Sequence, residues 1–285
     1  MAWKARGDAP LPPHGGFHRP RDRRHASGLA LGGGASWGWA HIGVLAALES
    51  SGMPVDVISG CSMGSVIAAL RSAGMEVKEL LEFAEYWRTR TRRFREWRFW
   101  RMSFLSERTV RKTFGEYFGE RAVNQTEIPF WANAVDVQTG KEYTIQSGAL
   151  VDCVRASIAL PGLLPPFPAG PCLLVDAGVA DPVPVRLVRR MGCQFAIGVN
   201  AMAAPEAHKV EARYPFSAFE VMMRCTLIMG HEVGQARAEQ AADVVFTPNV
   251  GGIAMLQFDR SPEIIECGRR ATEENLPHSW LATRG

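Results

Sequence analysis

Several features that mark other protein classes are missing from this sequence of 285 residues. It has no run of about 18 apolar residues, so no segment is predicted to span a bilayer. Its 6 cysteines show no C-x-x-C spacing, which argues against a zinc site and against a disulfide framework. A formal net charge of +3 is too small to indicate a nucleic-acid partner. We expect reduced thiols, no metal and a cytoplasmic location.

The ends of the chain differ in composition from its middle. Residues 1–27 lack the apolar core of a secretory signal and are rich in proline, glycine, histidine and arginine. We expect a flexible basic N-terminal tail there, one folded domain over residues 28–275 and a C-terminal tail over residues 276–285. Hydrophobic residues make up 47% of the chain and charged residues 21%, which is typical of a globular domain.

From Gly28 onward, short apolar runs alternate with segments of helical periodicity. The runs LALGGG, PVDVISG, PFWANAVDV, CLLVDAG, QFAIGVNA and DVVFTPN predict strands. Segments such as WAHIGVLAALESSG and SMGSVIAALRSAG predict helices between them. Because this order is typical of βαβ units, the sequence predicts a three-layer α/β/α domain with a mostly parallel central sheet.

Three consecutive glycines, Gly32 to Gly34, end the first predicted strand in LGGGASWGWAHIGVL. A glycine turn at this place either cradles a phosphate or supplies backbone amides to an oxyanion. A dinucleotide fingerprint that starts at Gly33 would need a glycine where the chain has Ala35, and no G-K-[ST] follows for a P-loop. The pattern therefore favours an oxyanion hole.

The pentapeptide GCSMG, which follows the second predicted strand, has the pattern G-x-S-x-G. Between a strand and a helix this pattern is typical of a nucleophile elbow, in which Gly60 and Gly64 leave room for Ser62 in a strained turn. The alternative is a serine that only caps a helix. One βαβ unit separates the pentapeptide from the glycine run, so we expect both at the same sheet edge.

A serine nucleophile also needs a neighbouring side chain that accepts its proton. Asp176 ends the apolar strand of LLVDAG, and a carboxylate at the end of a parallel strand points into the functional crevice. The alternative for Asp176 is an Asx turn or a helix N-cap. Among the histidines, His41 is expected to be structural, which leaves His208, His231 and His278 as alternative bases.

Together these segments resemble the patatin-like phospholipases over about residues 28–275. The resemblance rests on LGGGASWGWAHIGVL, on GCSMG, on VRASIALPGLLPPF with LLVDAGVADPVPV, and on the later ADVVFTPNV. It implies a dyad of Ser62 as nucleophile and Asp176 as proton acceptor, with no organic cofactor. It also implies an oxyanion hole of backbone amides from Gly32, Gly33, Gly34, Ala35 and Met63, with Gly38, Gly60, Gly64, Ala177 and Gly178 as supporting motif positions.

The chain departs from the family pattern at a few positions. Ala35 replaces a glycine, and Trp37 replaces the basic residue that usually precedes the last glycine, here Gly38. Ala177 and the pair Asp181–Pro182 replace other motif residues. Because the dyad is kept, the resemblance implies a serine acyl hydrolase that cleaves carboxylic esters of lipids, of the esterase, phospholipase A or lysophospholipase type. The alternatives are a catalytically silent lipid-binding or regulatory protein, and a histidine-dependent α/β-hydrolase or acyltransferase.

Residues 87–104, WRTRTRRFREWRFWRMSF, have the most unusual composition of the chain. Arginines interleaved with aromatic rings suit an anionic membrane surface. A cap helix that packs its rings over the core is the alternative, and single-stranded nucleic acid is not otherwise indicated. We therefore expect a lipid ester substrate, no nucleic acid, and a peripheral membrane contact or substrate rim that includes Arg95, Trp97, Arg98 and Trp100.

Overall fold

The computed structural model describes residues 27–92, 107–202 and 218–276, and within these ranges the strands form one mixed sheet. The strand order is β5-β6-β3-β2-β1-β7-β8, and β4 pairs with β3 beside this path. The strands are β1 (Ser27–Leu31), β2 (Val57–Gly60), β3 (Phe130–Asp136), β4 (Glu142–Ile145), β5 (Phe167–Ala169), β6 (Cys172–Asp176), β7 (Phe195–Val199) and β8 (Val244–Phe246).

The centre of the sheet is parallel, and one side of it is not. Strands β3, β2, β1, β7 and β8 pair in parallel, in agreement with the predicted three-layer, mostly parallel architecture. Strand β6 is antiparallel to β3, and β5 is antiparallel to β6. The expectation that Asp176 ends a parallel strand was therefore wrong. Strand direction cannot be read from an apolar run, because both directions bury the same side chains.

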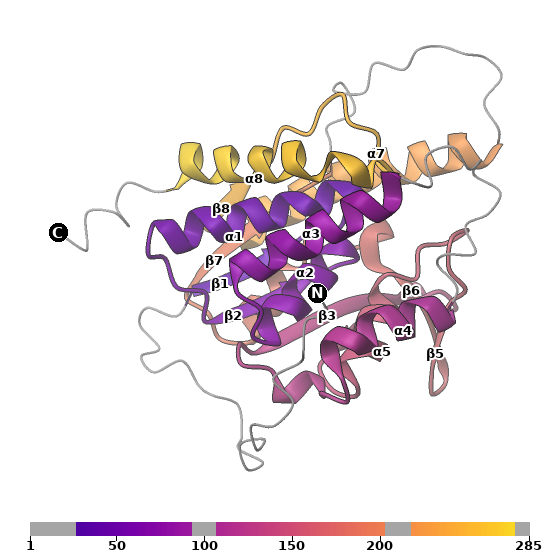
Figure 1. Cartoon of the computed structure of the whole chain (residues 1–285). Coiled ribbons are helices and arrows are strands. Elements are labelled where there is room, and N and C mark those ends of the chain that lie inside the picture. Colours follow the sequence, from indigo (N-terminus) through magenta and orange to yellow (C-terminus); the bar gives the residue numbers. More distant parts are fainter. Residues whose placement is uncertain (1–26, 93–106, 203–217, 277–285) are drawn as a thin grey trace.

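Helices cover both faces of the sheet (Figure 1). One face carries most of them, and α6 and α7 cover the other. The helices are α1 (Ala40–Ser50), α2 (Met63–Ser72), α3 (Val77–Arg92), α4 (Glu107–Phe118), α5 (Leu150–Ser157), α6 (Val185–Arg190), α7 (Ala218–Ala241) and α8 (Ser261–Asn275). None of the helices in the described ranges combines the length and the apolar character that crossing a membrane requires.

The alternation of side chains along β1 connects the two cores. Leu29 and Leu31 enter the larger core, on the side of α1, α2 and α8. Ala30 points to the opposite face and joins the smaller core with Val185 and Val188 of α6. Because successive residues of a strand point to opposite faces, a strand that is buried on both faces reads as a continuous apolar run. This is why the strands were visible in the sequence.

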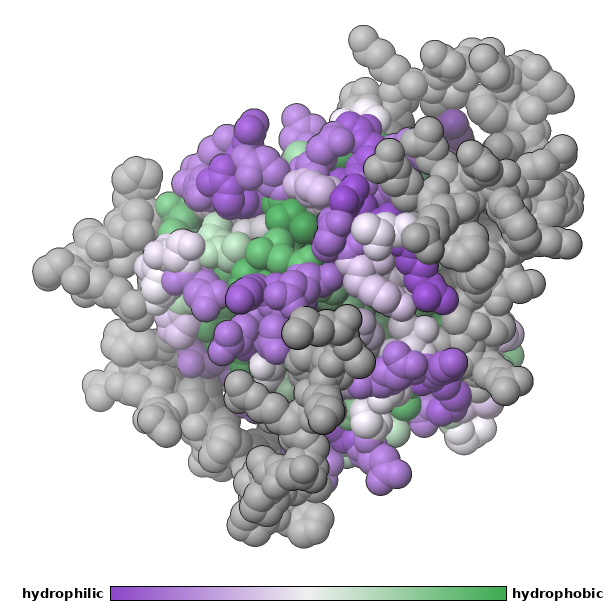
Figure 2. Space-filling model, in the orientation of Figure 1, coloured by the Kyte–Doolittle hydropathy of each residue, from purple (hydrophilic) through white to green (hydrophobic). Residues whose placement is uncertain are grey.

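Helices α1 and α8 pack closely because each has a glycine that faces the backbone of the other helix. A Cβ atom at Gly43 would lie 1.9 Å from the carbonyl oxygen of Ile265, and one at Gly268 would lie 1.9 Å from that of Ala40. In Figure 2 hydrophobic residues lie in the strip between the hydrophilic ridges of α8 and α3, where α1 runs in Figure 1. Both glycines therefore serve close helix packing.

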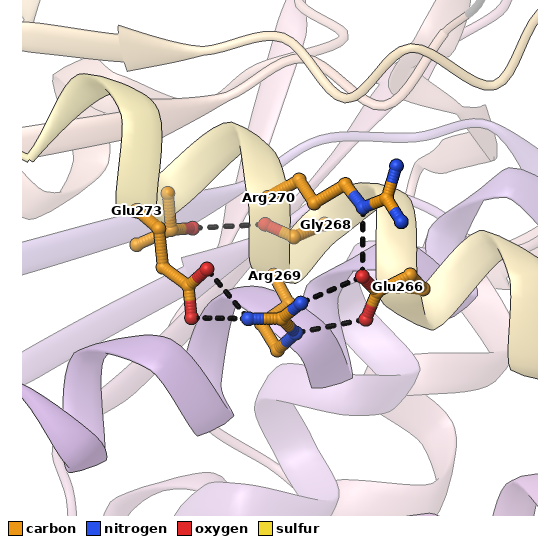
Figure 3. Close-up of polar contacts among 6 residues, drawn as sticks. Glu266, Gly268, Arg269, Arg270 and Glu273 are labelled. Carbon is orange, nitrogen blue, oxygen red and sulfur yellow. Dashed lines mark hydrogen bonds and ion pairs between the residues drawn. The ribbon is translucent and has the colours of Figure 1, made fainter.

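The outward side of α8 carries a chain of ion pairs (Figure 3). Arg269 Nη2 lies 2.6 Å from Glu266 Oε1, and Arg270 Nε lies 2.7 Å from the same oxygen. Arg269 also contacts Glu273 one turn further on. These side chains are 38–68% exposed, so solvent screens each pair and it contributes little to stability. Their spacing of three and four residues supports the helix locally.

Two predicted segments can be compared with the structure at their boundaries. Strand β1 begins at Ser27, one residue inside the predicted tail, and the Ser27 amide donates to Asp56 Oδ2 at 2.8 Å. Helix α3 includes the start of the arginine-rich segment and ends at Arg92. Arg95, Trp97, Arg98 and Trp100 lie outside the described residues, so their role stays a prediction.

Candidate active site

Ser62 occupies a strained turn between β2 and α2. Its φ is 52° and its ψ is −125°, a conformation that L-residues rarely adopt. The neighbouring glycines have no room for a side chain. A Cβ at Gly60 would lie 2.5 Å from the carbonyl oxygen of Gly64, and one at Gly64 would lie 2.2 Å from that of Leu31. The turn therefore has the geometry of a nucleophile elbow.

The strained turn is held by hydrogen bonds on both sides of Ser62. The Ser62 amide donates to Ser157 Oγ at 3.0 Å, from the last residue of α5. The Ser65 side chain donates back to the Ser62 carbonyl at 2.6 Å. Gly38 completes the close packing, because a Cβ there would lie 2.4 Å from Cγ of Met63. Ser157 is fully buried and was not singled out in the sequence.

The glycine run lies directly beside Ser62, but only part of it can bind an oxyanion. A Cβ at Gly33 would lie 3.4 Å from Cβ of Ser62. However, the Gly32 amide donates to the Val199 carbonyl and the Gly33 amide donates to the Pro182 carbonyl, both at 2.9 Å. These two amides are therefore engaged in the backbone network. Their assignment to the oxyanion hole does not agree with the structure.

Three of the predicted donors remain available. Within the described residues, no protein acceptor is recorded for the amides of Gly34, Ala35 and Met63. Met63 is the first residue of α2, so its amide is one of the N–H groups that a helix leaves unbonded. Gly34 has a φ of 145° and Ala35 a φ of 47°. Gly34 and Ala35 line the same pocket as Ser62.

Asp176 is the buried acid of this site. The Ser62 side chain is close enough to lower the pKa of this carboxylate, and both residues line one pocket. Asp176 Oδ1 accepts from the Gly178 amide at 2.8 Å and from the Cys61 thiol at 3.7 Å. The residue is 1% exposed, and this burial raises its pKa to about 6, against the opposing effect of the three donors. Asp176 is therefore ionised near neutral pH and has a raised affinity for a proton.

The D-A-G turn that follows β6 positions this carboxylate. Asp176 caps the short 3-10 turn η4 (Ala177–Val179) through its bond to Gly178, so the N-cap alternative also describes it correctly. Ala177 is fully buried beside Cys61. Capping a turn and contacting Ser62 are compatible, because a carboxylate accepts several hydrogen bonds at once.

Neither of the two histidines in the described ranges is recorded in contact with Ser62 or Asp176. His41 is fully buried, and its Nε2 lies 2.7 Å from the Gly32 carbonyl oxygen. Burial lowers the pKa of His41 to about 4, so the ring is neutral and donates to that oxygen. His231 Nδ1 lies 3.0 Å from the Met202 carbonyl oxygen. His208 and His278 lie outside the described residues.

Trp37 connects the glycine-rich loop after β1 to the segment before α8. Its side chain is 1% exposed, and its Nε1 donates to the Ile253 carbonyl at 2.8 Å. The neighbouring Ser36 donates from its amide to Met255 and from its hydroxyl to Ala254. The residue that replaces the family's cation is thus a core residue, and its polar atom holds a backbone carbonyl from the other end of the domain.

A small, mainly apolar pocket opens at Ser62. Seven segments that are separate in the sequence form it, and α7 supplies one wall. Its lining residues are Gly34, Ala35, Ser62, Leu160, Asp176, Gly178, Met202, Met223, Thr226, Leu227 and Met255. Met223 and Leu227 of α7 were not predicted, because apolar residues of a helix look alike whether they face the core or a pocket. The described residues form no group of three or more His, Cys, Asp and Glu suited to a metal ion.

Comparison with known proteins agrees with this arrangement of an elbow serine on a mixed α/β sheet. The family model of the patatin-like phospholipases matches residues 29–189, which include both Ser62 and Asp176. The chain is 32% identical over 216 residues to an uncharacterized NTE family protein of Mycobacterium tuberculosis. The chain therefore belongs to the patatin-like phospholipase family.

Other similar proteins are fungal and bacterial. Lysophospholipase NTE1 of Debaryomyces hansenii is 25% identical over 285 residues, and that of Aspergillus fumigatus is 33% identical over 207 residues. These alignments cover 90% and 68% of this chain but 18% and 13% of the fungal proteins, against 74% and 59% for the mycobacterial relative. Among solved structures, VipD from Legionella pneumophila shares the fold. Its TM-score is 0.52 at 11% identity, over 91% of this chain and 67% of VipD.

Proposed function

We propose that this chain is a serine acyl hydrolase that cleaves carboxylic esters of lipids, with Ser62 as nucleophile and Asp176 as base. The observation that carries the proposal is the juxtaposition at the elbow. A serine at φ 52° lines the same pocket as a buried carboxylate whose pKa is raised to about 6, and its side chain acts on that pKa. A base with a pKa just below neutral pH is ionised and still accepts a proton in the transition state.

The proposed reaction has two halves. Asp176 takes the Ser62 proton as Oγ attacks the ester carbonyl, and the proton then passes to the leaving alcohol as the ester C–O bond breaks. In the second half Asp176 takes a proton from water, the resulting hydroxide attacks the acyl-enzyme, and the fatty acid leaves as Ser62 regains its proton. The amides of Gly34, Ala35 and Met63 are the proposed donors to the oxyanion of both halves.

The substrate class follows from the pocket. Its walls of Met202, Met223, Leu227 and Met255 suit an acyl chain, whose transfer from water stabilises the complex by about 0.8 kcal/mol for each buried CH₂. The fungal relatives carry the name lysophospholipase. We therefore propose lysophospholipids and phospholipids as substrates, met at a membrane by a protein that attaches peripherally from the cytoplasm.

The histidine-dependent alternative receives less support. The His41 ring contacts the Gly32 carbonyl, and the His231 ring contacts the Met202 carbonyl. The silent lipid-binding alternative is also less favoured, because a strained serine and a buried carboxylate are both destabilising features that a binding pocket does not need.

Fluorophosphonate labelling tests the proposal. We expect wild type to label and to hydrolyse a lysophospholipid, and both activities to disappear in Ser62→Ala. We expect Asp176→Asn to lower turnover by at least about 10³-fold, as removal of a general base does in related chemistry. Ser51→Ala and Asp181→Asn are matched controls, because Ser51 lies at the end of α1 and Asp181 is a second buried acid.

Four results would contradict the proposal. Labelling that persists in Ser62→Ala would remove the nucleophile assignment, and full turnover in Asp176→Asn would remove the base. An unreactive wild type that still binds lysophospholipid would favour the silent lipid-binding protein. Loss of turnover on replacing His208, His231 or His278 would favour the histidine-dependent enzyme.

A further inference from the structure

The first three turns of α7 combine two properties that rarely occur on one helix of a soluble domain. Their inward side lines the pocket through Met223, Thr226 and Leu227. Their outward side is exposed and apolar: Val221 and Ile228 are each 47% exposed, Met222 is 55% exposed and Met229 is 58% exposed. A helix that is apolar on all sides is normally buried or lies in a membrane.

The outward apolar residues form one continuous face. Val221, Met222, Cys225, Ile228 and Met229 have the spacing i, i+1, i+4, i+7, i+8, which places them within an arc of about 120°. We call these five residues the α7 apolar face. Within residues 221–230 the only charged residue is Arg224. Scattered single apolar residues need no explanation, but a contiguous apolar face indicates a contact surface.

The apolar character stops where α7 leaves the pocket. Further along the same helical face the exposed residues are Glu232, Ala236, Glu239 and Gln240. The second half of the helix is anchored to the domain, for example through Asn200 Nδ2, which donates to Gln235 Oε1 at 3.0 Å. In Figure 1 the first turns of α7, in orange, extend at the right beyond the ends of α3 and α8. Apolar exposure is thus confined to the turns beside Ser62.

We propose that the α7 apolar face is an interfacial contact that inserts into the hydrocarbon boundary of a lipid bilayer and opens the pocket toward it. This inference rests on the proposed function. A lipid ester must leave an apolar phase to reach Ser62, and the shortest path from that phase runs along residues that border both the phase and the pocket. The α7 apolar face borders the pocket wall of Met223 and Leu227 on the same turns. Unbranched methionine side chains adapt readily to an irregular apolar surface.

The test measures binding without catalysis. In a Ser62→Ala background, co-sedimentation with phosphatidylcholine vesicles, with and without phosphatidylglycerol, is compared for the unchanged chain and for Met222→Gln/Met229→Gln. We expect the double variant to partition at least about tenfold more weakly, because two buried methionine side chains together exceed the 1.4 kcal/mol that corresponds to a factor of ten. Val137→Gln is the matched control, since Val137 is 53% exposed and lies outside the pocket lining.

Equal vesicle binding by the double variant and the unchanged chain would overturn the proposal. So would a dimer of the unchanged chain in light scattering that the double variant converts to monomer without a change in vesicle binding, because the face would then bind a second copy. Circular dichroism and thermal unfolding confirm that each variant is folded. Failure of the proposed function has a different signature: wild type would lack ester hydrolysis, while the vesicle measurement, which needs no turnover, would still decide the role of the α7 apolar face.

Discussion

The indole Nε1 of Trp37 donates a hydrogen bond to the carbonyl of Ile253 at 2.8 Å, and the ring itself is buried in the larger core. This bond joins the glycine-rich loop after β1 to a segment more than 200 residues further along the chain. A cation at position 37 would be buried in this apolar core, where the polar contact described for the side chain is to a backbone carbonyl.

We therefore predict that Trp37→Arg lowers the free energy of unfolding by about 3 kcal/mol or more, as expected for a charge placed in an apolar core. Trp37→Phe is the matched comparison. It keeps an aromatic ring and leaves only the Ile253 carbonyl without its donor, so the loss should be about 1–2 kcal/mol plus a term for the smaller ring. Urea unfolding measures both. Equal stability of Trp37→Arg and wild type would show that position 37 tolerates a cation.

Ala35 is strained in the native loop, with a φ of 47°. We predict that Ala35→Gly stabilises the protein by about 1 kcal/mol, because glycine adopts this conformation without steric cost. The control is Ala46→Gly, at a regular position of α1, where the same exchange should destabilise by about 1 kcal/mol. Opposite signs in thermal unfolding are expected. Destabilisation by both exchanges would show that the loop strain at Ala35 is negligible.

The pKa of Asp176, raised to about 6 by burial, sets the pH dependence of the proposed reaction. The base must be ionised, so kcat/KM should rise with pH through a midpoint near 6 and level off above it. A soluble short-chain ester, followed from acidic to neutral pH, is a suitable substrate. A flat profile across this range would exclude Asp176 as the titrating base.

Substitutions of Cys61 should shift the midpoint of the pH profile of kcat/KM in a predictable direction. Its thiol donates to Asp176, and burial together with the charge of Asp176 raises the pKa of Cys61, so that it stays protonated. Cys61→Ala removes a donor that stabilises the ionised carboxylate, so the midpoint should move to higher pH. Cys61→Ser keeps a donor and should leave the midpoint at or below that of wild type. A shift in the opposite order would show that Cys61 acts only by filling space.

The same carboxylate should make the fold less stable at neutral pH. The pKa of Asp176 is higher in the folded protein than its ordinary value of 3.8, so the folded state binds the proton more tightly. Its stabilising contribution is present below about pH 4 and is lost as the pH rises to about 6. Asp176→Asn should therefore unfold less readily than wild type at about pH 8, by about 1–3 kcal/mol, and show no gain at about pH 4. Lower stability at both pH values would contradict this.

The features that the sequence predicted correctly are local. The Ser62 turn follows from five consecutive residues, and the strands follow from apolar runs buried on both faces. The errors concern contacts between distant segments. Gly32 and Gly33 were assigned as oxyanion donors, but their amides pair with carbonyls of Val199 and Pro182, about 150 residues or more away in the chain. The pocket wall on α7 and the role of Ser157 depend on the same kind of long-range contact, which periodicity does not reveal.

Strand β3 contributes no reacting group, but it sets the distance between the two residues of the proposed dyad. Ala132 pairs with Gly60 on the parallel side, and Ala134 pairs with Asp176 on the antiparallel side. Two residues of one strand, about 6.6 Å of backbone, therefore define how far the base stands from the elbow. If either strand pairing shifted by one two-residue repeat, Ser62 would move away from the Asp176 carboxylate. The sequence of the site would be unchanged. The distance between the proposed nucleophile and its base is therefore set by a strand that supplies neither of them.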